Sequence, residues 1–95
     1  VAAVGSHVVL LVKPQFEVGR TSVKGGLVTD PALRADAVST VMWAAWDAGM
    51  GTAGVMASPI VGTHGNAEFL VHLIPGGGAN PTEYRSDVVA VTGGR

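Results

Sequence analysis

The strongest constraint on the fold is the apolar run Val8–Val12, which ends abruptly at Lys13 and Pro14. An unbroken run of this kind is typical of a strand covered on both faces, as in a parallel sheet. Pro14 has no N–H for a strand ladder and disfavours helix at Lys13, so the strand must end there. We therefore expect Lys13 at the carboxyl end of a buried strand, where open α/β sheets place their ligands.

A second apolar run follows the turn GNAE at residues 65–68 and predicts a strand over Glu68–Ile74. Because the loop before it is short, we expect this last strand to run antiparallel, with Lys13 and Glu68 as partners at one rim of a small sheet. Two ordinary charges at strand ends are one interpretation. The other is a Lys–carboxylate pair that positions or deprotonates a weakly acidic hydroxyl.

The clearest helix signal begins at Asp30, which can cap exposed N–H groups, and Pro31, which loses no hydrogen bond at the first helical position. Gly49 is suited to end the helix in a left-handed conformation. Trp43 is predicted to face solvent, as cover for the helix flank or as a partner surface. The apolar side is predicted to be a stripe with a flanking row: Leu33, Ala37, Val41, Ala44 and Ala48, beside Val38, Met42 and Ala45.

A short strand is predicted over Thr52–Ala57, so that strand, helix and strand form a crossover unit that should be right-handed and parallel. The pattern GMGTAG at residues 49–54 matches the dinucleotide motif G-x-G-x-x-G. That motif requires a strand before it and a helix after it, the reverse of the order here. We therefore interpret these glycines as a helix-to-strand turn.

The whole chain is predicted to be a single α/β domain, with a core over residues 4–75 and a tail over residues 76–95. The tail opens on three glycines, and Asn80 then starts a capping box that predicts a short helix through about Val91. Residues 1–5 resemble the end of a helix, so we expect the chain to begin in the middle of a domain.

Composition excludes several classes of function. The 95 residues include no cysteine, which removes disulfides and cysteine metal sites and fits a reducing compartment. Only 14% of residues are charged and the net charge is −1, so the chain alone has no electrostatic footprint for nucleic acid. No apolar run approaches the roughly 20 residues that a membrane helix needs.

The histidines and one long loop are the remaining candidates. His7, His64 and His72 lack metal-ligand spacing and predict no metal site, and only His64 is a candidate for substrate contact. The glycine-containing segment 15–30 carries Arg20 and Lys24 and is predicted to be a mobile loop at the rim that holds Lys13. Loops of this length are either functional or idle connections.

Four segments together resemble a known family: LVKPQFEVG at 11–19, VTDP at 28–31, ASP at 57–59 and GNAEF at 65–69. In order and spacing they are similar to the C-terminal part of the TlyA or hemolysin A family. These are FtsJ-like ribosomal RNA ribose 2′-O-methyltransferases that use S-adenosylmethionine. The resemblance covers about residues 4–73.

The resemblance implies the C-terminal portion of a class I, Rossmann-like methyltransferase sheet: its last three strands and the helix between them, with the last strand antiparallel. It also implies catalytic roles, because the second Lys and the Glu of the family's Lys-Asp-Lys-Glu tetrad match Lys13 and Glu68. The first Lys, the Asp, the glycine-rich cofactor loop and the RNA-binding domain have no counterpart here. We therefore expect no cofactor-binding residue in this segment and no activity from it alone.

The resemblance further implies partners. Ribosomal RNA and ribosomal subunits would be reached through the full-length protein, in the cytoplasm. Arg20 and Lys24 are candidates for phosphate contact, and His64 and Asn66 lie in a loop expected near the RNA.

Two other hypotheses stay open. One is a non-catalytic binding or pore-forming protein, as the hemolysin name suggests, although no cationic amphipathic helix supports it. The other is self-association: if Val8–Val12 lacks a neighbouring strand, its apolar edge invites pairing with a second copy.

Overall fold

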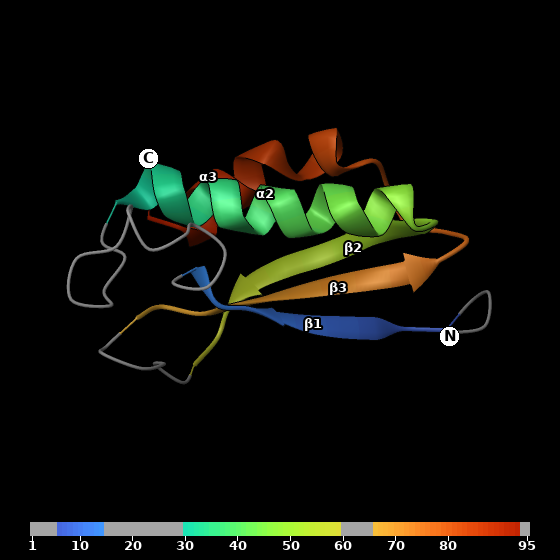
Figure 1. Cartoon of the computed structure of the whole chain (residues 1–95), viewed down its shortest axis with the longest axis horizontal. Coiled ribbons are helices and arrows are strands. Elements are labelled where there is room, and N and C mark those ends of the chain that lie inside the picture. Colours follow the sequence, from blue (N-terminus) through green and yellow to red (C-terminus); the bar gives the residue numbers. More distant parts are fainter. Residues whose placement is uncertain (1–5, 15–29, 60–65, 94–95) are drawn as a thin grey trace.

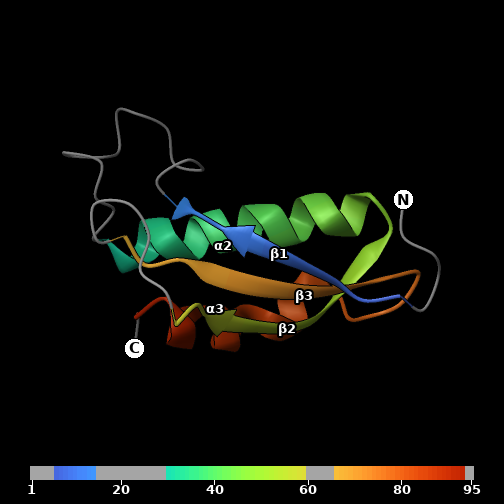
Figure 2. The same ribbon diagram turned by 90° about the horizontal axis from the view of Figure 1, so that it is seen from below.

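The computed structural model describes residues 6–14, 30–59 and 66–93, which form a three-stranded sheet with helices packed on one face (Figures 1 and 2). The strands are β1 (Val8–Val12), β2 (Met50–Ala57) and β3 (Phe69–Pro75). The helices are α2 (Pro31–Asp47), the 3-10 turn η3 (Pro81–Tyr84) and α3 (Arg85–Val91). The helix end expected at residues 1–5 lies outside the described residues.

The sheet order is β1-β3-β2, and β3 runs antiparallel to both neighbours. The antiparallel last strand is therefore confirmed. β1 and β2 point the same way, as a crossover requires, but β3 lies between them, so the two strands of the crossover unit do not pair with each other. A strand that returns from the end of β2 needs only a short connection when it runs antiparallel. Because it lies between β1 and β2, β3 forms backbone hydrogen bonds with a strand on each side.

The core lies between the sheet and the helices. On β3 alternate residues are buried, among them Phe69, Val71 and Leu73, and the residues between them face the other side of the sheet. This alternation is the strand period of two. α2 and α3 both lie on the buried side, and Figure 2 shows the opposite face of the sheet with no described helix across it. The core residues are Val12, Ala37, Val38, Met42, Ala45, Phe69, Val71, Leu73 and Val88.

The prediction that β1 is covered on both faces is wrong for this structure. Val9 is 60% exposed and Leu11 48%, and in β1 only Val12 is buried. The reason is that Val9 and Leu11 are the register partners of His72 and Leu70 and so project from the face of the sheet that no described helix covers. An apolar run predicts a strand but does not say how many neighbours cover it.

The boundaries of α2 follow the predicted signals. The Asp30 side chain accepts a hydrogen bond from the Ala32 N–H at 2.9 Å, Pro31 is the first helical residue, and Gly49 takes φ +90° just past the end. The buried face is Ala37, Val38, Met42 and Ala45, which is the predicted flanking row plus one stripe residue. Ala44 and Ala48 of the predicted stripe are exposed, because the helix directs the flanking row to the core in place of these two residues. Trp43 is exposed, as predicted.

The glycines of residues 49–54 only partly form a turn. β2 begins at Met50, so Gly51 and Gly54 are strand residues and Gly49 alone takes the turn conformation. Gly51 donates its N–H to Gly77 O at 2.9 Å, and a Cβ on Gly51 would collide with the backbone of Gly77 and Gly78. This close approach, invisible in the local pattern, is why a glycine stands inside the strand.

The tail packs on the core. Ala79 and Thr52 exchange two backbone hydrogen bonds of 2.8 and 2.9 Å, which continue the sheet at the outer side of β2. Asn80 caps the following turn through Thr82 N, as predicted, and the helix then divides into η3 and α3. Val88 of α3 is buried in the core. In the described part of the chain, no helix is both long and apolar enough to cross a bilayer.

Candidate functional site

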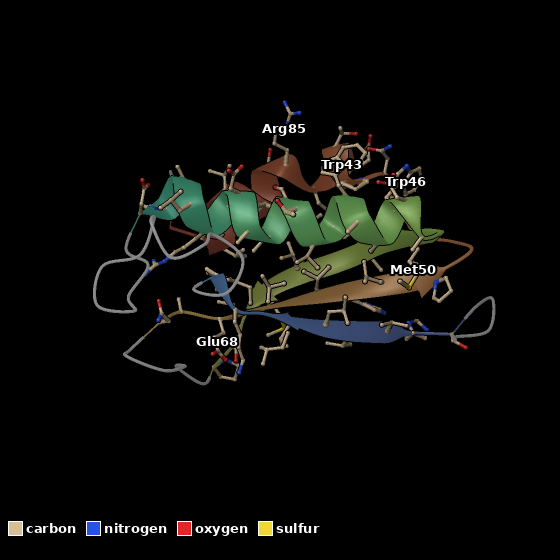
Figure 3. All side chains as sticks on the ribbon, viewed as in Figure 1. Trp43, Trp46, Met50, Glu68 and Arg85 are labelled. Atoms are coloured by element: carbon tan, nitrogen blue, oxygen red, sulfur yellow. The ribbon has the colours of Figure 1, made fainter. Side chains whose placement is uncertain are left out.

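The candidate site lies at the end of the sheet where β1 finishes and β3 begins. Val12 and Phe69 are antiparallel partners, and they are the last residue of β1 and the first of β3. Lys13 directly follows Val12 and Glu68 directly precedes Phe69, so the register puts these two positions across from each other. Figure 3 shows Glu68 at this end of the sheet, far from Arg85 on α3.

Polar side chains at this end are largely buried. Glu68 is 6% exposed and Asn66 1%, and Lys13 is half-buried beside the buried Pro14. A buried carboxylate costs free energy unless a cation or hydrogen-bond donors compensate for its lost hydration. The ammonium group of Lys13, at the facing strand end, is a cation suited to that role.

The third strand ends at the same rim. Ser58 follows β2, and its N–H donates to Glu68 O at 2.8 Å, which extends the ladder past Ala57 and Phe69. The backbone of Glu68 is therefore fixed by β2 as well as by β3. All three strands contribute to the rim, which carries an amine and a carboxyl group on facing strand ends. Together, these two groups are able to orient a hydroxyl group or to help remove its proton.

The other predicted contact residues divide into two sets. Arg20, Lys24 and His64 lie outside the described residues. Asn66 is described, and its side chain lies in the interior of the rim instead of on its surface. A role for any of these four residues in binding a substrate stays a prediction.

Sequence reasoning missed one polar contact. His7 and His72 are 65 residues apart, yet His7 Nδ1 lies 2.6 Å from His72 Nε2. Only the register of β1 against β3 brings them together, so no local spacing could have predicted the pair. Among the described residues, no three His, Cys, Asp or Glu side chains form a cluster that would enclose a metal ion.

The family model described as FtsJ-like methyltransferase matches residues 2–74. The chain is 48% identical over 69 residues to the 16S/23S rRNA (cytidine-2′-O)-methyltransferase TlyA of Mycobacterium tuberculosis, a match that covers 72% of this chain and 26% of that protein. It is 47% identical over 70 residues to a candidate rRNA methyltransferase, YqxC, of Bacillus subtilis, covering 73% of this chain and 25% of that one.

Solved structures agree with these matches. A candidate hemolysin from Streptococcus thermophilus superposes with a TM-score of 0.82 at 38% identity, covering 96% of this chain and 34% of the other. A candidate hemolysin from Lactococcus lactis gives a TM-score of 0.75 at 34% identity, covering 90% and 44%. The chain thus spans about a quarter of the length of the curated relatives and a third or more of these structures.

Proposed function

The chain belongs to the FtsJ-like methyltransferase family, and on that premise we propose that it forms part of an enzyme that methylates ribose 2′-hydroxyls of ribosomal RNA. The relatives named as rRNA methyltransferases support the substrate class, and one of them is named for 2′-O chemistry. A ribosomal substrate would place this activity in the cytoplasm, with S-adenosylmethionine as the methyl donor.

The observation that carries the proposal is the register that sets Lys13 opposite Glu68 at one rim of the sheet. Lys13 would hold the ribose 2′-hydroxyl and help it to lose its proton, a contribution of roughly 10²–10⁴-fold in typical general base catalysis. A neighbouring carboxylate favours the protonated form of an amine, so Glu68 fits the role of orienting Lys13 better than that of activating it.

The described residues do not themselves fit a nucleotide-type cofactor. Residues 49–54 and 76–78 are both rich in glycine, but the first segment lies in and before β2, and the backbone of its Gly51 is packed against Gly77 and Gly78 of the second. To bind a nucleotide-type cofactor, such glycines must lie at the start of a helix, with their backbone N–H groups available to hydrogen-bond the cofactor. We propose that the donor binds to the part of the methyltransferase domain that the longer relatives have beyond the matched region.

The test uses the full-length polypeptide that carries this chain, with purified ribosomal subunits and S-adenosylmethionine labelled in its methyl group. We expect Lys13→Ala and Glu68→Ala each to lower the rate of methyl incorporation at least about 100-fold, because each removes half of the pair. Circular dichroism should show an unchanged fold in both variants.

Matched controls separate this effect from a general loss of charge. Arg85→Ala removes an exposed cation of α3, far from Glu68 in Figure 3, and Glu83→Ala removes an exposed anion of η3, which directly precedes α3; both should leave the rate within about twofold. Wild-type rates in Lys13→Ala and Glu68→Ala would overturn the assignment of the site. A wild-type protein that methylates no ribosomal RNA would overturn the proposed function itself.

A second function is suggested by the names of several relatives. One, Hemolysin A of Brachyspira hyodysenteriae, is 40% identical over 67 residues. Leakage of dye from liposomes on addition of the purified protein, unchanged by Lys13→Ala, would favour a non-catalytic membrane-active or binding role. Intact liposomes together with active methylation would favour the enzyme.

A further inference from the structure

The contact between His7 and His72 joins two strands on the uncovered face of the sheet. Val9 is the register partner of His72, and His7 lies two residues before Val9, so both histidines project from the same face. Their facing nitrogens, His7 Nδ1 and His72 Nε2, are 2.6 Å apart, and the ring centroids are 4.8 Å apart with the planes tilted by 32°. Two imidazole nitrogens therefore converge on one point.

That point is open to solvent. His7 is exposed and His72 is half-buried. On the other side of His72 its register partner is Gly54, and a Cβ placed on Gly54 would meet only the His72 Cβ, at 3.8 Å. No side chain of β2 stands over the ring at this position. A shallow hollow of about 410 Å³ continues from His72 along the sheet, lined mainly by apolar residues: Val9, Gly54, Val55, Met56 and Leu70.

Imidazole nitrogen is a favoured ligand of Cu²⁺, Ni²⁺ and Zn²⁺, with metal–nitrogen distances of about 2.0–2.1 Å. Two such nitrogens at adjacent corners of a square plane are about 2.9 Å apart, and at two corners of a tetrahedron about 3.4 Å. The observed distance of 2.6 Å between the two nitrogens would have to increase slightly for square-planar coordination and more for tetrahedral coordination. Square-planar ions therefore fit this pair best.

We propose that His7 and His72 form an open two-ligand site for a square-planar divalent transition metal ion, Cu²⁺ above all. Since no third His, Cys, Asp or Glu joins them among the described residues, water or an added ligand would complete the coordination. Copper also heads the order of affinity of such sites for divalent ions. The site lies on the open face, at the other end of β1 from Lys13, and its test does not rest on the proposed methyltransferase function.

Binding exchanges one hydrogen bond for two coordinate bonds. In the neutral pair, one facing nitrogen carries the N–H proton and the other accepts it. When the ion enters, that proton moves to the outer nitrogen of the same ring through solvent, so that both facing nitrogens present lone pairs. No electron is transferred, and the ion remains Cu²⁺. The absence of cysteine removes the thiol that most readily reduces it.

The ligands come from two strands that only the folded chain brings together, so the ion should bind the folded state far better than the unfolded chain. Binding of this kind raises the melting temperature in proportion to the logarithm of the ion concentration above Kd. The ion would link β1 to β3 at the start of β1, next to the first pair of the ladder, Val8 and Leu73.

The test is a titration of the untagged protein with CuSO₄ followed by calorimetry, with electron paramagnetic resonance at one equivalent. We expect one Cu²⁺ per chain, hyperfine structure from two nitrogens, and a rise in melting temperature with Cu²⁺ that exceeds the rise with Zn²⁺. Mg²⁺, which prefers oxygen ligands, should give none.

The variants His7→Phe and His72→Phe keep a ring in place but remove the ligand. Each should weaken Cu²⁺ binding at least tenfold and abolish the rise in melting temperature, whereas His64→Phe, the matched control from the same chain, should behave as wild type. The site would be overturned if the wild-type spectrum showed fewer than two coordinated nitrogens. It would also be overturned if His7→Phe and His72→Phe bound Cu²⁺ as tightly as His64→Phe, or if His64→Phe lost as much Cu²⁺ affinity as they do. The first of these readouts does not depend on how well any variant folds.

Discussion

The two strands that flank β3 have the same direction and the same central partner, but they are protected very differently. β2 is packed under the helices, and its outer side is continued by the tail through the hydrogen bonds of Thr52 with Ala79. β1 is anchored in the core by Val12, while Val9, Leu10 and Leu11 stay exposed. Position next to a central strand therefore does not decide how well a strand is buried; the helices over its face and the segment at its outer edge do.

The largest expected effect tests the protection of β2. Gly51→Ala should lower the free energy of unfolding by about 3 kcal/mol, since the added Cβ meets backbone atoms of Gly77 and Gly78 that cannot move independently. Gly54→Ala, in the same strand, should change it by less than about 1 kcal/mol, because its Cβ makes only an ordinary contact with His72. Urea denaturation measures both, and equal losses would mean that the tail does not protect β2.

A smaller effect tests the anchor of β1. Val12→Ala should cost about 2 kcal/mol, the value of burying an aliphatic side chain, because Val12 is 1% exposed. Leu11→Ala, in the next position and 48% exposed, should cost less than about 1 kcal/mol. The two midpoints in urea give the comparison directly, and a larger loss for Leu11 would show that the face of β1 from which Leu11 projects is covered in solution.

The smallest effect on stability tests the side of β1 that no described strand covers. We propose that this side pairs with a second copy, because the strand carries no charge or proline of its own to prevent pairing. Leu11→Lys should shift sedimentation at high concentration from dimer to monomer, while the free energy of unfolding of the monomer stays within about 0.5 kcal/mol. Wild-type protein that sediments as a monomer throughout would contradict the proposal.

Features with a local cause could be predicted from the sequence. Asp30, Pro31 and Gly49 determine the ends of α2 through capping, a fixed φ and a left-handed stop, and each acts on its immediate neighbours. The antiparallel direction of β3 followed from a short connection. The position of Lys13 at a strand end followed from Pro14, which has no N–H to donate.

Features with a distant cause could not. The insertion of β3 between β1 and β2, the exposure of Leu11 and the pairing of His7 with His72 depend on which strands meet, and no window of the sequence contains that information. The local pattern predicts a turn at Gly51, whereas the backbone that Gly51 packs against lies 26 positions further along the chain, at Gly77. The roles of Lys13 and Glu68 stay predictions, supported by their register.

The five-residue ladder between β1 and β3 has a consequence for both ends of the molecule. A slip of one strand by two residues would keep every side chain on its own face but move it about 7 Å along its partner. Such a slip would part Lys13 from Glu68 and His7 from His72 in the same event. Copper bound by the histidines would therefore stabilise the register that aligns Lys13 with Glu68 at the other end of the sheet. The spectrum of the bound copper would report whether that register is formed.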